Sequence, residues 1–156
     1  MYFKDYSKYS YNLGVELEKV KNIGWISHEF PFSVGESNNA FKKKLLEIIF
    51  LKDCNRMRGV HICDICQENY YLFVHKSGHI LKSKNLSIPQ KDTKLLGHSE
   101  ICIPSKDGDF VYASPTLIYH YILEHHYLPS KDYIESVLAF DMSLDSEEIF
   151  NTYFII

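Results

Sequence analysis

The sequence contains no run of apolar residues close to the length of about 18 that spans a bilayer. Segment 1–14 has no basic stretch followed by an apolar one, so it does not resemble a secretory signal. Phosphate-binding glycine loops, G-x-S-x-G nucleophile turns and dinucleotide fingerprints are also missing. Positive charge is not in excess, because 17 Lys and Arg face 20 Asp and Glu, a formal net charge of −3. We therefore expect a soluble, cytoplasmic protein that contacts no membrane and does not bind nucleic acid through bulk electrostatics.

What the chain does contain is enough apolar residues for a core. Its 156 residues are 46% apolar and 15% aromatic, which is typical of a globular protein and too apolar for a disordered one. A chain of this length can bury one core, and no repeat or linker divides it. We expect one α+β domain over residues 1–156, with a tail at 141–156 that mixes acidic and apolar residues.

Local patterns predict about three helices and two β-hairpins. The expected helices cover 37–51, 114–125 and 130–138, and the expected hairpins pair 70–74 with 80–84 and 100–103 with 110–113. Asn38 or Asn39 can cap the first helix. Ser114 followed by Pro115 is typical of a helix start, with serine as the cap. We expect 85–98 to be a loop, 25–30 to be a short strand or packed loop, and 149–156 to form a final strand.

The most informative pattern is Cys63-x2-Cys66 together with His120-x4-His125. Two thiolates three positions apart can hold one metal on a tight turn, and two histidines near a helix end complete a Cys2His2 set, a usual donor set of structural zinc. Five helical residues rotate by about 140°, which would point the two rings apart. We therefore expect the helix to loosen or tighten in its last turn before His125.

Three other interpretations of the cysteines stay open. A redox Cys-x-x-Cys needs a strand-to-helix turn, whereas the residues after Cys66 look like a strand. A Cys63–Cys66 disulfide conflicts with a reducing compartment. The two cysteines can also be ordinary buried residues beside capping histidines. Cys54 and Cys102 have no partner at ligand spacing, and Cys102 is most simply a small buried hydrophobe.

Three further residues are candidates for a supporting role or an alternative ligation. His61 precedes Cys63 by two positions, and His126 directly follows His125. Glu100 is one of two carboxylates, with Glu124, that a catalytic metal site would use. The simpler roles of these carboxylates are a salt bridge or cap for Glu100 and a surface charge for Glu124.

Several blocks of the sequence resemble an uncharacterised bacterial protein family. Segment 58–66 is similar to its RG-x-H-x-C-x-x-C motif and segment 97–101 to its G-x-x-E-I strand. Segment 112–129 resembles its Y-x-A-P-x-L-I-x-H-Y-x-x-x-H-x-Y-x-P block. The resemblance covers about residues 2–138 and implies a shared fold and metal site, without a reaction. The family usually has glycine where His126 stands, which suits a left-handed helix stop.

These patterns favour a non-catalytic, zinc-stabilised domain that binds another protein. Four protein ligands leave no open position for a substrate, and tyrosines provide contact area at low entropic cost. A bacterial immunity protein that covers the active site of a cognate toxin is one concrete form of this hypothesis. The alternatives are a hydrolase-like enzyme with an open zinc site and a nucleic-acid-binding zinc domain. The latter predicts a lysine cluster beside the metal, whereas Lys82, Lys84, Lys91 and Lys94 are more typical of an ordinary polar loop.

Overall fold

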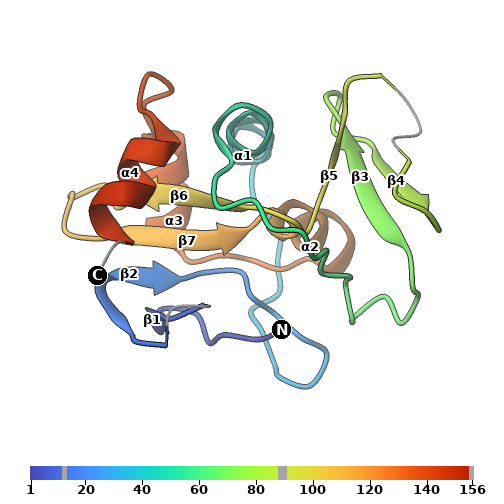
Figure 1. Ribbon diagram of the computed structural model, residues 1–156, viewed down its shortest axis with the longest axis horizontal. Coiled ribbons are helices and arrows are strands. Elements are labelled where there is room, and N and C mark those ends of the chain that lie inside the picture. Colours follow the sequence, from blue (N-terminus) through green and yellow to red (C-terminus); the bar gives the residue numbers. More distant parts are fainter. Residues whose placement is uncertain (12–13, 88–90, 155–156) are drawn as a thin grey trace.

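The computed structural model describes residues 1–11, 14–87 and 91–154 of the chain. Within them the protein is an α+β fold of four helices and two β-sheets, with the helices packed mainly on the larger sheet (Figure 1). In chain order the elements are β1 (Lys8–Tyr9), β2 (Leu17–Asn22), α1 (Asn39–Lys52), β3 (Tyr71–His75), β4 (Ile80–Ser83), β5 (Thr93–Leu95), β6 (Glu100–Pro104), β7 (Val111–Pro115), α2 (Ile118–His125), α3 (Lys131–Leu138) and α4 (Ser146–Tyr153).

The larger sheet has the strand order β1-β2-β7-β6, and one of its faces borders the core. Strands β6 and β7 form an antiparallel hairpin that pairs Glu100 with Pro115, whereas β2 joins β7 in parallel. All five residues of β7 are buried, because this central strand has a neighbour on each side and elements on both faces. The predicted hairpin of 100–103 with 110–113 is confirmed; β6 ends one residue later than expected, and β7 begins one residue later and ends two residues later.

The smaller sheet, of order β4-β3-β5, stands at the opposite end of the molecule from α4 (Figure 1). Its β3–β4 hairpin is the one expected around Lys76-Ser77-Gly78, and Gly78 has the positive φ of 95° that the turn needs. The third strand, β5, lies inside the segment expected to be a loop, of which residues 88–90 are outside the described residues. Because β5 has only three residues, its pattern is too short to identify a strand.

Helix α1 supplies the apolar stripe that the sequence predicts. Asn38 caps it by accepting a hydrogen bond from the backbone N–H of Phe41 at 2.7 Å. The stripe packs on β6 and the neighbouring helices, and its buried members are Phe41, Leu45, Leu46, Ile48 and Ile49. The core thus lies between α1 and the larger sheet, with α3 and α4 at one end.

The predicted start of the second helix at Ser114 is wrong. Ser114 and Pro115 are the last residues of β7, and the helix begins at Ile118. Ser114 does not cap the helix, because its buried hydroxyl donates to the hydroxyl of Tyr133 at 3.0 Å. Pairing with β6 therefore prevails over the local capping pattern.

The expected strand at 149–156 is also wrong, and its last two residues lie outside the described residues. The chain forms α4 instead, which Asp145 caps by accepting from the backbone N–H of Glu147 at 3.0 Å. Two glutamates in the first turn suit the positive end of the helix dipole. Phe154 follows the helix and packs edge-on against Tyr9, with ring centroids 4.8 Å apart, so the tail belongs to the core.

The N-terminal region contains two strands, β1 and β2, that the sequence patterns did not predict. Residues 25–30 are a packed loop, one of the two alternatives expected there. Trp25 is buried and donates its indole N–H to the carbonyl of Ala113 at 3.0 Å, which fixes this loop on β7. Among the described residues, no helix combines the length and apolar character needed to cross a membrane.

Candidate metal centre

The Cys/His centre is built from two segments that are distant in the sequence. Cys63 and Cys66 lie on a tight turn before β3, and His120 and His125 lie on α2. One donor atom from each of these four side chains lies within 4.8 Å of the others. The structure therefore brings the four predicted ligands close enough to bind one metal ion.

The contacts run between sulfur and nitrogen atoms across the centre. The Sγ atom of Cys66 lies 3.3 Å from Nε2 of His120 and 3.3 Å from Nε2 of His125. The Sγ atom of Cys63 lies 3.4 Å from Nε2 of His125. Both rings thus present the same nitrogen to the thiols, although their planes are nearly perpendicular at 86°.

The end of α2 differs from the expectation. Helical structure continues through His125, so no loosening or tightening precedes this residue, and the backbone changes at His126 instead. His126 is left-handed, with φ 54° and ψ 29°, and its N–H and that of Tyr127 both bond the carbonyl of Tyr121. The rings nevertheless converge, with centroids 4.9 Å apart, because the imidazole side chains are long enough for both to reach the Sγ atom of Cys66.

Burial sets the protonation of the donors. Desolvation raises the pKa of the Cys63 thiol to about 12, against hydrogen bonds from the backbone N–H groups of Cys66 and Ile65 that favour its thiolate. Desolvation also lowers the pKa of the fully buried His120 to about 3, and the neighbouring His125 adds to this effect. His120 is therefore a neutral imidazole with a free nitrogen lone pair at neutral pH.

The residues present fit a zinc ion. Two sulfurs and two imidazole nitrogens form a donor set typical of structural zinc, and backbone N–H groups directed at a cysteine sulfur would stabilise its metal-bound thiolate. The buried Nδ1 of His120 has no hydrogen-bond partner among the described residues, and the carboxylate of Glu124 lies 3.6 Å from it. A ligating histidine normally directs this second nitrogen at a carboxylate or carbonyl. The four residues that would hold the ion are Cys63, Cys66, His120 and His125.

Two contacts position the cysteine turn against the rest of the fold. The carboxylate of Asp64, between the cysteines, accepts from the hydroxyl of Ser27 at 2.9 Å and the N–H of His28 at 3.2 Å. On the other side, the N–H of His61 donates to the carbonyl of Gly97 at 2.8 Å. Gly97 has a φ of 95°, and a Cβ atom there would collide with the carbonyl oxygen of His61, so this approach requires glycine.

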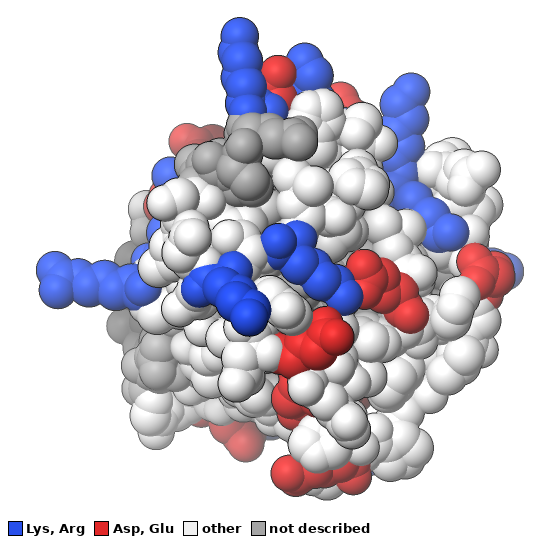
Figure 2. All heavy atoms as spheres, turned by 90° about the vertical axis from the view of Figure 1, so that its right-hand side faces the viewer, with Lys and Arg blue, Asp and Glu red and all other residues white. Residues whose placement is uncertain are grey.

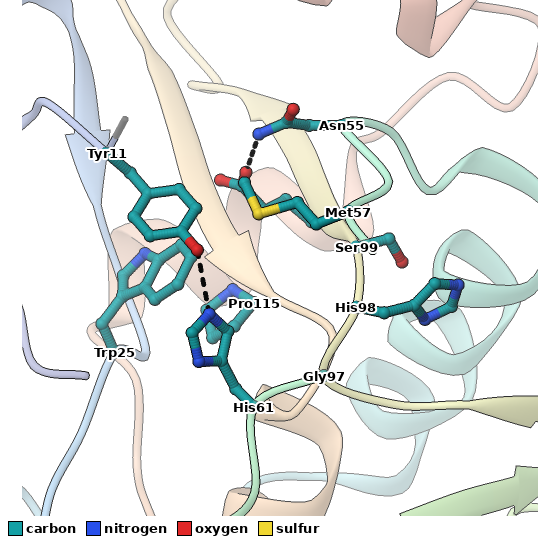
Figure 3. A pocket seen from close by; sticks show the side chains of 10 residues that line it. Tyr11, Trp25, Asn55, Met57, His61, Gly97, His98, Ser99 and Pro115 are labelled. Atoms are coloured by element: carbon teal, nitrogen blue, oxygen red, sulfur yellow. Dashed lines mark hydrogen bonds between the residues drawn. The ribbon is translucent and has the colours of Figure 1, made fainter. Parts of the chain in front are cut away.

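The three supporting candidates lie outside the centre. Nε2 of His61 is 2.9 Å from the hydroxyl of Tyr11, and Figure 3 shows this ring directed at Tyr11. Nδ1 of His126 is 2.7 Å from the carboxylate of Glu36. Glu100 is buried in β6, where one oxygen accepts from the hydroxyl of Tyr9 at 3.0 Å and from the side-chain amide of Asn55.

Glu100 borders a small cavity of about 10 Å³, which is shown in Figure 3. None of the four Cys and His residues of the centre lines it, and the side chains of His98 and Ser99 point away from it. Burial raises the pKa of Glu100 to about 7, while the hydrogen bonds from Asn55 and Tyr9 oppose the rise. Glu124, the other carboxylate proposed for catalysis, is partly exposed beside His120 and lies 3.9 Å from the amine of Lys82.

Comparison with protein families gives one match. Residues 1–138 match the family described as a domain of unknown function, DUF7919. The chain belongs to this family. The match includes both segments of the metal centre, and α4 lies beyond it. The DUF7919 family is uncharacterised, as the sequence resemblance implied, so membership assigns no reaction. Comparisons with curated proteins and with solved structures give no significant match.

Proposed function

We propose that this DUF7919 chain is a protein-binding domain stabilised by one structural zinc ion, without catalysis at the metal. The observation that carries the proposal is the convergence of two thiols and two imidazoles within 4.8 Å. The turn and α2 are more than 50 residues apart in the sequence, as in the 54-residue separation of Cys66 and His120. An ion bound to both would cross-link the fold at the junction of its two sheets.

Burial of the centre supports a structural role over a catalytic one. A catalytic zinc site keeps a position for water or substrate, whereas four protein donors fill a tetrahedral ion. His120 and Cys63 are both buried, and the cavity that borders the two cysteines has a volume of only about 10 Å³. That space is close to the minimum for one water molecule.

Cobalt substitution tests this role. Co²⁺ bound to two sulfurs and two nitrogens in a closed tetrahedral site has intense visible absorption bands that depend on the ligands. We expect these bands in the cobalt-loaded protein, unchanged by added azide or thiocyanate at concentrations that leave the protein folded. Bands that shift with either anion would reveal an open position and would favour the alternative function, a hydrolase-like metalloenzyme.

A protein partner fits the surface better than a nucleic acid. Figure 2 shows lysine and acidic side chains side by side on the face that carries the smaller sheet. Lys82 lies 3.5 Å from Glu68, and Lys76 lies 3.3 Å from Asp92, so neighbouring carboxylates offset these positive charges. Elsewhere Phe30 remains 43% exposed while stacking on Tyr2, and exposed aromatic rings are typical of protein interfaces.

Within this class, we propose an immunity protein that covers the active site of a cognate bacterial toxin. The formal charge of −3 suits a basic nuclease as the partner. A toxin gene directly upstream would support the proposal, and a metabolic operon would contradict it. The direct experiment expresses that toxin with and without this chain and measures growth and complex formation. Growth rescue with a stoichiometric complex is expected, and toxicity that persists despite folded, zinc-loaded protein would overturn this form of the proposal.

A further inference from the structure

A second pair of cysteines lies in the core. Cys54 follows α1 and pairs with Glu100 through two backbone hydrogen bonds of 2.8 and 2.9 Å. Cys102 stands two residues beyond Glu100 on β6, so its side chain lies on the same face of the sheet. The two Sγ atoms are 2.7 Å apart, although 48 residues separate the cysteines in the sequence.

This separation is far below the contact distance of two unbonded sulfur atoms and approaches a covalent bond, which is about 2.05 Å. Both residues are buried, with exposures of 0% and 1%, and neither belongs to the Cys/His centre. We propose that Cys54 and Cys102 are a disulfide-forming pair, which the fold cross-links when it forms in the presence of a low-molecular-weight disulfide.

Thiol–disulfide exchange with one small disulfide molecule forms this bond, and no other reactant is needed. The thiolate of one cysteine attacks the small disulfide, breaks its S–S bond and releases one small thiol. The second cysteine then attacks the mixed disulfide, forms the Cys54–Cys102 bond and releases the other small thiol. Two electrons pass from the protein sulfurs to the oxidant, and the two cysteine protons leave with the released thiols.

The position of the pair decides when this exchange can occur. Hydrogen bonding to Cys54 and burial raise the pKa of Cys102, so the reactive thiolate is scarce in the folded protein. Helix α4 packs on β6, and its Ser146 hydroxyl donates to the carbonyl of Lys52, two residues before Cys54, at 2.7 Å. A mixed disulfide therefore requires α4 to open, or forms while the chain is still folding. The cross-link is expected to form rapidly during refolding and slowly in native protein.

Refolding of the full chain tests the pairing. Denatured, reduced protein is diluted into a glutathione redox buffer with zinc, quenched with acid, unfolded, alkylated and digested with trypsin. Cleavage places Cys54 in peptide 53–56, Cys102 in peptide 95–106 and both Cys63 and Cys66 in peptide 59–76. The expected product joins 53–56 to 95–106, with peptide 59–76 fully alkylated. Alkylation of all four cysteines, or pairing spread among the alternatives, would overturn the proposal.

Two further measurements separate this pair from the metal centre. Protein that has been refolded and oxidised with zinc and is then treated with a chelator should lose the metal and keep the bond between peptides 53–56 and 95–106, because neither cysteine belongs to the Cys/His centre. Oxidation should raise the Tm of the wild-type protein by on the order of 10 °C, because the bond closes a long loop. Dithiothreitol should reverse the rise, and Cys54→Ala should not show it. An equal rise in the Tm of Cys54→Ala on oxidation would contradict the pairing. The peptide map is made on the wild-type chain, so that test does not depend on the folding of a variant.

Discussion

The Sγ atom of Cys66 lies 3.3 Å from Nε2 of His120, and 54 residues separate the two in the sequence. Between them the chain forms the whole of the smaller sheet and the β6–β7 hairpin. A metal ion between these atoms would therefore close a loop that contains five of the seven strands of the described chain. Structural zinc in small peptides contributes about 10–16 kcal/mol of apparent binding energy, which exceeds the net stability of many domains.

Removal of a ligand should release the metal and lower stability. For Cys63→Ser and His120→Ala we expect loss of stoichiometric zinc and a fall in Tm of more than about 10 °C. Elemental analysis and thermal unfolding of the same preparations measure both effects. His79→Ala is the matched control, because His79 is an exposed residue that does not belong to the centre, and it should keep both zinc and Tm. Wild-type zinc content in either ligand variant would show that the residue does not ligate.

Gly97 tests the approach of the cysteine turn to the β5–β6 connection. A Cβ atom at this position collides with the carbonyl of His61, whereas at Gly108 it would meet no atom of the described part of the chain within 4 Å, and both glycines have positive φ. Gly97→Ala should therefore lower the free energy of unfolding by at least about 1 kcal/mol more than Gly108→Ala, because the latter adds only backbone strain. Urea unfolding of both variants measures the difference. Equal costs would mean that the contact with His61 does not constrain the fold.

Glu100 should make stability depend on pH. Burial raises its folded-state pKa to about 7 from an ordinary value of 4.5, so the folded state holds the proton more tightly. The resulting stabilisation is complete below about pH 4.5 and is lost as the pH rises through about 7. It amounts to about 3 kcal/mol.

Urea unfolding of wild-type protein and Glu100→Gln at pH 5 and pH 8, at constant free zinc, measures this effect. The neutral amide cannot titrate, so the free energy of unfolding of the variant should rise relative to that of the wild type by about 2.5 kcal/mol between pH 5 and pH 8. Glu47→Gln changes an exposed carboxylate on α1 and is the control. Its free energy of unfolding should differ from that of the wild type by the same amount at pH 5 and at pH 8. Parallel curves for Glu100→Gln would contradict the raised pKa.

Substitution of His126 separates helix stopping from metal ligation. His126 is left-handed, and its exposed hydrogen bond with Glu36 contributes little, so the glycine variant should be more stable to unfolding than the alanine variant by about 1 kcal/mol. Both His126→Gly and His126→Ala should retain zinc. Loss of zinc from both variants would identify His126 as a ligand in place of His125.

The Cys/His cluster is predictable from sequence because metal binding would require few residue types at short spacings. Cys63-x2-Cys66 and the two histidines on α2 identify the donors, but the spacing argument placed the change in the helix one residue too early. A rotation per residue describes Cβ directions and ignores the reach of the imidazole side chains. The pairing of Cys54 with Cys102 had no local signal, since it depends on the contact of Cys54 with Glu100 across the sheet.

The fold, too, was predicted correctly where the pattern lies within one segment and wrongly where the structure depends on pairing between distant segments. The stripe on α1 and the two hairpins follow from periodicity and turn residues within one segment. Ser114-Pro115 was misread because strand pairing with β6 outweighs a capping pattern, and this pairing is not visible in the local sequence. The start of α4 could have been found from its cap, Asp145, and the two glutamates of its first turn, which together favour a helix N-terminus.

Zinc content together with the X-ray absorption spectrum of the purified protein tests the central claim most directly. Protein prepared under reducing conditions without chelators should contain one zinc ion per chain, surrounded by two sulfur and two nitrogen atoms. Protein that is folded but holds no stoichiometric zinc, or zinc without sulfur neighbours, would contradict the account.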